Sequence, residues 1–307
     1  MKIVSENLRK NIILIPPCFT YGDCHSVIGV LYYLLEYYQN VYFFIGEDRV
    51  KNYYQLYFSN DPLNNNRIFI ISDPTEMINN GQYGEYDVCN TAGDWESPDN
   101  FLKIDSLVNI DKSYYFSYLN PLYNKLDINE KYKLYTNKYL ARKEGEKSIN
   151  HIVYYELLGL NNNVRMEYFN YVRNLENELN FKSNILKHYN CIDNKYNIIN
   201  DPIGASNLFK QVIDNDYPII NISNLSECVG DIILLVEGAE TINFIESNNT
   251  NFFYHSQYKG IFNYVKKINL HVWMRDRDWS IYNMDNAWKM TNYPKLENWE
   301  FVFKNNI

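Results

Sequence analysis

The sequence predicts an α/β protein built from two doubly wound, Rossmann-like halves. Short apolar runs typical of strands alternate with segments of helical periodicity, first near the start of the chain and again after Cys191. The length of 307 residues is enough for two domains of ordinary size. A β-α-β-α-β order predicts a parallel sheet with right-handed crossovers.

In the first half, residues 11–15 (NIILI) form a continuous apolar run, as expected for a parallel strand covered on both faces. Apolar side chains then recur at helical spacing from Val27 to Tyr38. Further strands are expected at 41–45, 67–71 and 86–90, with a helical segment at 50–58.

The middle of the chain reads as helical, at 148–160 and at 164–189. The elements expected after it are strands or extended runs at 196–200, 217–223, 232–236, 251–256 and 268–274, a turn at 237–238, a helix at 239–247, and terminal helix turns at 282–290 and 297–303. We therefore expect an acceptor-side domain at 1–185 and a nucleotide-sugar-binding domain with a terminal helical segment at 186–307. Two such domains facing each other form a central cleft between the carboxyl ends of both sheets, where ligands bind.

The composition narrows the class of protein. A hydrophobic content of 46% and a charged content of 21% are typical of a soluble globular chain. The formal net charge of -8 argues against a general nucleic-acid binder, which shows a basic footprint. The 30 tyrosines, with many Asn, Ile, Lys and Phe, indicate an AT-rich genome, such as that of a protist, a bacterium or a large DNA virus.

Cysteine usage and the N-terminus bear on location. The five cysteines are odd in number, widely spaced and without a C-x-x-C pair, which predicts neither a disulfide framework nor a zinc site. The first residues lack the apolar core of a signal peptide, and no apolar run approaches the ~20 residues that span a bilayer. We expect a cytoplasmic protein without a membrane span, in the host cytoplasm if the source is a large DNA virus.

The loop at 16–26 follows the first strand, at the end of a parallel sheet where ligands bind. Gly22 permits a tight turn or a close approach of the backbone to a ligand, which makes it a donor-binding candidate, and Asp23 precedes the predicted helix. Asp23 either caps that helix or acts as a general base, and His25 orients Asp23, binds a phosphate or packs. Gly29, inside the helix, costs roughly 1 kcal/mol relative to Ala and indicates close packing of the helix on a strand.

Two nucleotide motifs are absent from the sequence. Neither G-x-G-x-x-G nor the Walker pattern G-x-x-x-x-G-K-[ST] occurs, so nicotinamide-dependent and P-loop chemistry lose support.

The stretch ILIPPCFTYGDCHSVIGVLYYLLEYYQNVYFFI resembles the amino-terminal segment of the heptosyltransferase-like glycosyltransferases of family 9. Those begin with a strand, a Gly-Asp-x-x-His loop, a helix and a second strand, whereas Gly22-Asp23-Cys24-His25 places the histidine one position closer. The resemblance covers some thirty residues and implies the GT-B fold, metal-independent transfer of a sugar from a nucleotide donor with inversion, and Asp23 as the base that deprotonates the acceptor hydroxyl.

In the second half, LLVEGAETINFIE resembles the strand–Gly–helix element that holds the donor in that family. The family usually has a small residue and a histidine after the glycine, and this chain departs from that pattern. A helix N-terminus there would favour a pyrophosphate, and acidic side chains would accept hydrogen bonds from hydroxyls; the alternative is a plain turn. The candidate donor-binding residues here are Glu237, Gly238, Glu240 and Thr241.

Two further loops offer donor-site candidates, each with a structural alternative. Gly204 and Lys210 follow the strand at 196–200 and are suited to a phosphate, or to a turn and a surface lysine. His255, Ser256 and Lys259 end the expected strand at 251–256.

On the acceptor side, Tyr21, Asp94 and Trp95 are candidates to meet a sugar, and a structural Trp is equally consistent. Asp276 and Asp278 alternate with arginines, which favours salt bridges over a metal site.

We therefore expect a GT-B-like glycosyltransferase of glycan biosynthesis that moves a sugar from a nucleotide-sugar donor to an acceptor hydroxyl. No cofactor or metal is expected, and the partners are the nucleotide sugar and a glycan acceptor. The alternative is a non-catalytic nucleotide- or glycan-binding protein that kept the fold.

Overall fold

In a computed structural model of the chain, the residues described are 9–16, 21–45, 48–72, 86–90, 161, 163–202, 204, 216–223, 225–226, 228–245, 247–271 and 296–302. The expected helices at 148–160 and 282–290 lie outside these residues, as do the candidates Asp94, Trp95 and Lys210.

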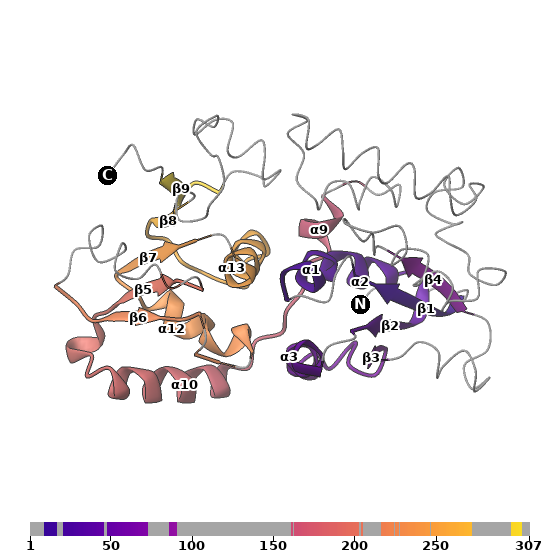
Figure 1. The fold of residues 1–307 in the computed structure, drawn as a ribbon, viewed down its shortest axis with the longest axis horizontal. Helices are drawn as coiled ribbons and strands as arrows, with labels where there is room; N and C mark the ends of the chain where they lie inside the picture. The colour runs from indigo at the N-terminus through magenta and orange to yellow at the C-terminus, as the bar shows by residue number, and fades with distance from the viewer. Residues whose placement is uncertain are drawn as a thin grey trace. The chain divides into compact units, whose positions relative to one another are not determined.

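The chain divides into two compact units, Met1–Asn170 and Tyr171–Ile307 (Figure 1). Each unit contains a sheet in which every described strand pairs in parallel with its neighbours. The prediction of an α/β protein with two parallel sheets is therefore confirmed. The division follows Asn170, so the second unit begins earlier in the chain than the boundary expected at 185.

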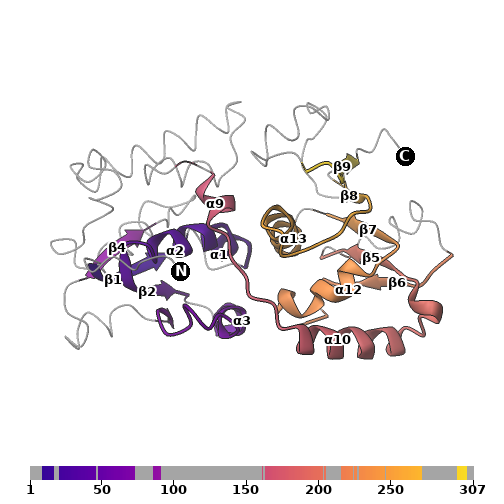
Figure 2. The ribbon, with the colours of Figure 1, turned by 180° about the vertical axis from the view of Figure 1, so that it is seen from behind.

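The sheet of the first unit has the strand order β3-β2-β1-β4. Its strands are β1 (Arg9–Ile15), β2 (Tyr38–Phe44), β3 (Ile68–Ile71) and β4 (Tyr86–Asn90). Strands β2 and β4 flank β1, so the direction of winding reverses beside β1 (Figure 2). Such a reversal is a topological switch point, and the chain leaving β1 enters it from the carboxyl edge.

Four described helices belong to this unit: α1 (Tyr21–Ser26), α2 (Ile28–Leu34), α3 (Asp48–Ser59) and α9 (Val164–Glu167). The side chains that α3 buries are spaced at i, i+3, i+4, i+7 and i+8, the pattern of an amphipathic helix: Val50, Tyr53, Tyr54, Tyr57 and Phe58. Two of these tyrosines also satisfy their hydroxyls, because Tyr54 donates to the carbonyl of Tyr21 and Tyr57 to that of Asn170. Tyrosine therefore serves as a core residue in this unit.

Gly29 permits a close approach between two helices. A Cβ at this position would lie 2.7 Å from the Cα and carbonyl oxygen of Arg165 and from the carbonyl oxygen of Val164. The expectation of close packing is confirmed, but the partner is the backbone of α9 and not a strand.

The sheet of the second unit has the order β6-β5-β7-β8-β9. Its strands are β5 (Asn197–Asn200), β6 (Ile219–Asn221), β7 (Thr241–Phe244), β8 (Ile268–His271) and β9 (Trp299–Val302). In chain order this reads 2-1-3-4-5, one of the two common doubly wound arrangements. Its switch point lies between β5 and β7.

The helical segments of this unit are α10 (Leu175–His188), η1 (Ile192–Asn194), η2 (Val229–Ile232), α12 (Ile233–Glu237) and α13 (Asn248–Tyr258). Two begin with side-chain caps: Asn174 accepts from the amide of Asn177, and Ser247 accepts from that of Thr250. The α13 helix packs Phe253 against Phe244 of β7 and Tyr254 against Trp299 of β9.

The two strands and the helix expected between residues 232 and 256 have the wrong secondary structure. The expected strand at 232–236 is helical, the expected helix at 239–247 contains β7, and the expected strand at 251–256 lies in α13. A short, continuous apolar run such as IILLV fits a buried helix turn as well as a buried strand. Because this run was assigned to a strand, the next two elements were predicted as a helix and a strand, the reverse of what the structure contains.

Two other expectations are corrected. The segment 164–189 is not one helix, because residues 168–174 separate α9 from α10. The run at 297–303 contains β9, an edge strand among those described, and not a helix turn.

Candidate functional site

The residues predicted after β1 lie in a helix. Tyr21, Gly22, Asp23 and His25 all belong to α1, whereas the sequence predicted a loop up to Ser26. Tyr21 packs its ring edge-on against Tyr53 with 5.1 Å between ring centroids, and the guanidinium of Arg49 lies 5.7 Å from the same ring. Asp23 lies in α1, the first described helix after β1, and its role as a base stays a prediction.

His25 is a packed core residue. Its side chain has no exposed surface, and its ring lies 5.5 Å from that of Phe169 and 6.4 Å from that of Tyr57, centroid to centroid. Burial, and then the nearby charge of Arg165, lower the pKa of His25 to about 3. The imidazole is therefore neutral at pH 7, which argues against the alternative of a phosphate contact, whereas the alternative that His25 packs is confirmed.

The candidates at 237–241 lie at the wrong edge of the second sheet for a donor cradle. Glu237 ends α12, Gly238 caps it, and Thr241 begins β7. In a parallel sheet the residues that precede a strand lie at its amino edge, whereas ligands bind at the carboxyl edge. The structural premise for placing the pyrophosphate here, a strand followed by a helix, is wrong.

Each of these side chains has a structural partner. Thr241 donates its hydroxyl to Asn197 Oδ1 at 2.7 Å, and Glu240 forms a largely exposed salt bridge with Lys266 at 2.8 Å. A Cβ at Gly238 would lie 2.5 Å from Lys182 Nζ and from the Tyr196 hydroxyl, so packing accounts for the glycine.

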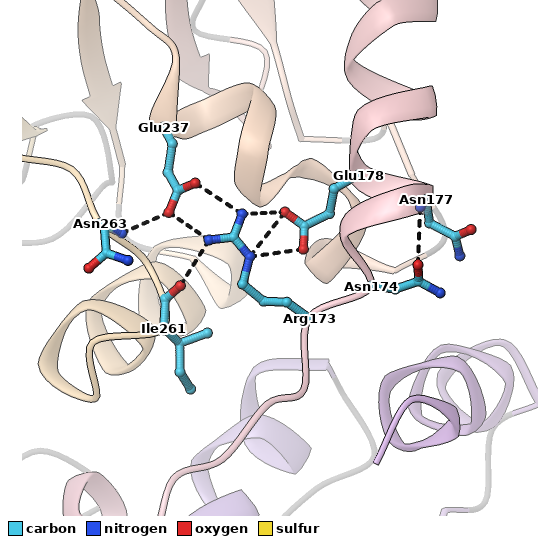
Figure 3. A network of polar contacts seen from close by, with 7 residues as sticks. All are labelled: Arg173, Asn174, Asn177, Glu178, Glu237, Ile261 and Asn263. Carbon is cyan, nitrogen blue, oxygen red and sulfur yellow. Dashed lines mark hydrogen bonds and ion pairs between the residues drawn. The ribbon is translucent and has the colours of Figure 1, made fainter. Parts of the chain in front are cut away.

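Glu237 belongs to an ionic network centred on Arg173. Figure 3 shows the guanidinium between two carboxylates: Nη1 and Nη2 contact Glu237 at 2.8 and 2.9 Å, and Glu178 receives hydrogen bonds from Nε and Nη2. Arg173 also donates to the carbonyl of Ile261, and Glu237 accepts from the amide of Asn263. Burial disfavours the charge of Arg173, but the hydrogen bonds and charges of both glutamates outweigh it and raise its pKa.

The remaining donor candidates are dispersed. Gly204 has a φ of 76° with open space where a Cβ would stand, so the backbone turn itself calls for glycine. His255 and Ser256 are buried inside α13, with 1% and 0% exposure. Lys259 caps the carboxyl end of that helix, about 18 Å along its axis from Ser247.

A polar network that the sequence reading missed lies at the carboxyl edge of the second sheet, beside its switch point. Asn200, the last residue of β5, is its fully buried centre. Its amide nitrogen donates to Ser247 Oγ and to Thr250 Oγ1, while its amide oxygen accepts from Ser223 Oγ at 3.1 Å and from Asn249 Nδ2 at 3.4 Å. Asn200 thus joins the chain following β5, β6 and β7, and we call this set the Asn200 network.

Donor counting fixes the hydroxyl orientations in the network. Thr250 donates its single hydroxyl hydrogen to the carbonyl of Ile245 at 2.6 Å. Ser247 must therefore be the donor in its 3.2 Å contact with Thr250 Oγ1. The helix cap of α13 is consequently locked to the end of β5.

The rim of the network keeps unused hydrogen-bonding capacity. Among the described residues, Asn249 uses one amide hydrogen, and its Oδ1 has no hydrogen-bond partner. At the end of β6, Asn221 Oδ1 accepts from the amides of Asp201 and Ser223. Ser223 Oγ lies 2.8 Å from the same oxygen, so its single hydrogen is shared between Asn221 Oδ1 and Asn200 Oδ1. No lysine or arginine among the described residues joins these groups, and the contacts of Asp201 with Asn221 are made by its backbone amide and carbonyl. Amides and hydroxyls suit a polyhydroxylated ligand better than a phosphate.

A second polar group lies at the end of β8. Nε2 of His271 lies 2.8 Å from Asn243 Oδ1, which also accepts from Asn269 Nδ2 at 3.1 Å. Because that oxygen is an acceptor, Nε2 carries the ring hydrogen. Burial lowers the pKa of His271 to about 4, so it too is neutral at pH 7.

One sequence signal could have found the Asn200 network. Ser247-Asn248-Asn249-Thr250 is rich in the residues that favour helix caps, directly after an apolar run. Read as a helix start, it places β7 before it and moves the candidate site from Gly238 to Ser247. Ser223 carries no comparable local signal, because its partner Asn200 is distant in the sequence.

Compared with protein-family models, curated proteins and solved structures, the chain matches none of them. Across the described part of the chain, no helix is both long and apolar enough to cross a membrane. Within the same residues, no three His, Cys, Asp or Glu side chains gather where they could hold a metal ion.

Proposed function

We propose that the protein is a glycosyltransferase of GT-B type that takes a sugar from a nucleotide-sugar donor. The observation that carries this proposal is the Asn200 network at the switch point of the second sheet. A crevice at the carboxyl ends of parallel strands, where winding reverses, is where doubly wound sheets bind nucleotides. The first unit, a second parallel sheet with its own switch point, supports an acceptor site on the same polypeptide.

The chemistry of the Asn200 network supports a role in holding the hydroxyl-bearing part of the donor. Asn249 offers one acceptor and one donor, the complement of a vicinal diol in ribose or in the transferred sugar. A site that pairs its polar groups with substrate hydroxyls rejects analogues lacking them, because those groups are then left unpaired. We therefore assign donor recognition to this edge, in place of the turn at 237–241.

In the first unit, Asp23 is the proposed base. It would take the proton of the acceptor hydroxyl as the acceptor oxygen bonds to the anomeric carbon and the nucleoside diphosphate leaves. Its support is its place in α1, shortly after the carboxyl end of β1, together with the family 9 resemblance. His25 has no part in this step, since it is buried and packed against Phe169.

The second candidate function is a nucleotide- or glycan-binding protein without catalysis. The same polar network favours it, because recognition of hydroxyls does not require a base.

A thermal-shift panel of UDP, GDP, ADP, CMP and dTDP identifies the nucleobase of the donor, since a ligand that binds the folded state raises the apparent stability of the protein. Hydrolysis and transfer of the matching nucleotide sugars are then measured for wild type and Asp23→Ala. Loss of turnover with retained nucleotide binding in Asp23→Ala supports the transferase. Binding without turnover in wild type supports the second candidate, and the absence of any nucleotide binding refutes both.

A further inference from the structure

The chain passes between its two units once, from Asn170 to Tyr171. On the first side, the carbonyl oxygen of Asn170 accepts from the hydroxyl of Tyr57 at 3.0 Å, and its Nδ2 donates to Asp61 Oδ2 at 3.4 Å. The two preceding residues are held as well: Phe169 is 1% exposed beside His25, and Tyr168 donates to Glu36. Tyr168, Phe169 and Asn170 are therefore all anchored to the first unit.

On the second side, anchoring begins with the next residue. Tyr171 is 4% exposed, packs edge-on against Phe252 at 5.3 Å between centroids, and shares a side-chain hydrogen bond with Cys228. A Cβ at Gly230 would stand 1.7 Å from the Tyr171 hydroxyl, so the chain keeps a glycine where this ring enters. Two residues later, Arg173 binds α10 through Glu178 and α12 through Glu237 (Figure 3).

The connection between the units therefore contains no residue that belongs to neither of them. A typical linker holds several residues that belong to neither flanking unit, in Pro-, Gly- or polar-rich sequence. Here the peptide plane is tied to the first unit through the Asn170 oxygen, and the Tyr171 ring is tied to the second. The backbone bonds flanking this peptide are the ones left to rotate.

We propose that the two units move as rigid bodies about the single peptide between Asn170 and Tyr171, and that Arg173 is the clamp that confines the pivot to that peptide. Hinges are commonly a few element-terminal residues that absorb a change in φ and ψ, and this one is short because both neighbours are anchored. The inference does not depend on the proposed function, since it rests on the anchoring contacts alone.

The test measures the distance between spin labels on exposed Ser59 of α3 and exposed Ser183 of α10, both replaced by cysteine. Cys18, Cys89 and Cys191 are replaced by serine, and buried Cys24 and Cys228 are retained. A second label pair, at Ser183 and at Val265, which is 92% exposed, reports on the second unit alone.

The variants are Arg173→Ala, the milder Glu237→Gln, and a two-glycine insertion after Asn170. The matched control is Glu240→Gln, which breaks the exposed pair with Lys266 in the same unit.

The expected result is a distance distribution at least 1.5-fold broader in Arg173→Ala and in the insertion variant, with a smaller broadening in Glu237→Gln. Glu240→Gln is expected to match wild type, and the Ser183–Val265 pair to stay unchanged throughout. The proposal is overturned if Arg173→Ala broadens the distribution no more than Glu240→Gln, or if broadening appears equally within the second unit. It also fails if the insertion leaves the distribution unchanged, because contacts elsewhere would then fix the units.

Discussion

Replacing Arg173 by methionine is expected to destabilise the second unit far more than the loss of an ordinary surface ion pair. Arg173 makes two-pronged contacts with both Glu178, which is 1% exposed, and Glu237, which is 14% exposed. Removing the cation leaves the Glu178 carboxylate buried without its counter-charge, and breaking a buried pair in this way costs about 3 kcal/mol or more. With a urea m-value of about 2 kcal/mol/M, the midpoint of the affected transition falls by about 1.5 M.

The assay is urea unfolding followed by circular dichroism, with Glu240→Gln as the matched control. The Glu240–Lys266 pair is 36% and 50% exposed, so its loss is expected to cost less than about 1 kcal/mol. The double variant Arg173→Met/Glu178→Gln should recover part of the loss, because no buried charge then remains at position 178. The prediction is refuted if Arg173→Met lowers the urea midpoint no more than the control does. It is also refuted if the losses in unfolding free energy simply add in the double variant, because the charge of Glu178 would then play no part.

Three further predictions concern stability. His25 has a folded pKa of about 3 against 6.5 unfolded, so its contribution is present above pH 6.5 and is lost at about 1.4 kcal/mol per pH unit as pH falls toward 3. In pH-dependent unfolding curves, His25→Gln should remove this share of the dependence and leave that of His271, whose pKa burial also lowers; an unaltered slope would show that His25 does not contribute. Gly29→Ala should cost about 1–3 kcal/mol in urea unfolding, because its Cβ meets backbone atoms of α9 at 2.7 Å, and these cannot move aside as a flexible side chain would. A neutral result, or the stabilisation that Ala gives at an open helix position, would contradict the close packing. Asn200→Ala should cost about 1–3 kcal/mol by stripping partners from Ser247, Thr250 and Ser223, and a neutral result would mean that the network does not hold the sheet edge together.

The first sheet was largely predictable, because turn-forming residues separate its apolar runs. Residues 11–15, 67–71 and 86–90 read as strands, and the structure contains β1, β3 and β4 there. The helix at 50–58 was equally legible, since its buried residues keep a strict helical spacing. These elements carry their pattern locally, so no knowledge of the tertiary fold is needed to recognise them.

The second half failed where a local pattern was ambiguous. IILLV has no polar residue to reveal a period, and its helical state follows from packing that the sequence does not display. The error moved the candidate site, because Gly238 was taken as the end of a strand when it is the end of a helix. The Asn200 network was only partly accessible from the sequence: Ser247-Asn248-Asn249-Thr250 carries a helix-start signal, but Asn200, Ser223 and Thr250 meet only through the order of the strands.

His25 shows the same limit for a single residue. An Asp and a His close together after a strand suggested shared chemistry, but the structure buries the ring against Phe169 and Tyr57. Phe169 lies so far along the chain that spacing alone could not identify this packing.

The proposed transferase requires the donor to bind at the carboxyl edge of the second sheet, at the rim of the Asn200 network. The most direct test compares Asn249→Ala with Glu240→Gln in calorimetric titration with UDP, GDP, ADP, CMP and dTDP and the matching nucleotide sugars. Asn249 lies at that rim with its Oδ1 unused, whereas Glu240 lies at the amino edge, so each variant probes one edge. If the donor binds there, Asn249→Ala weakens binding at least tenfold and Glu240→Gln changes it by no more than twofold. Weakening by Glu240→Gln with unchanged binding in Asn249→Ala would contradict it and return the site to the turn at 237–241.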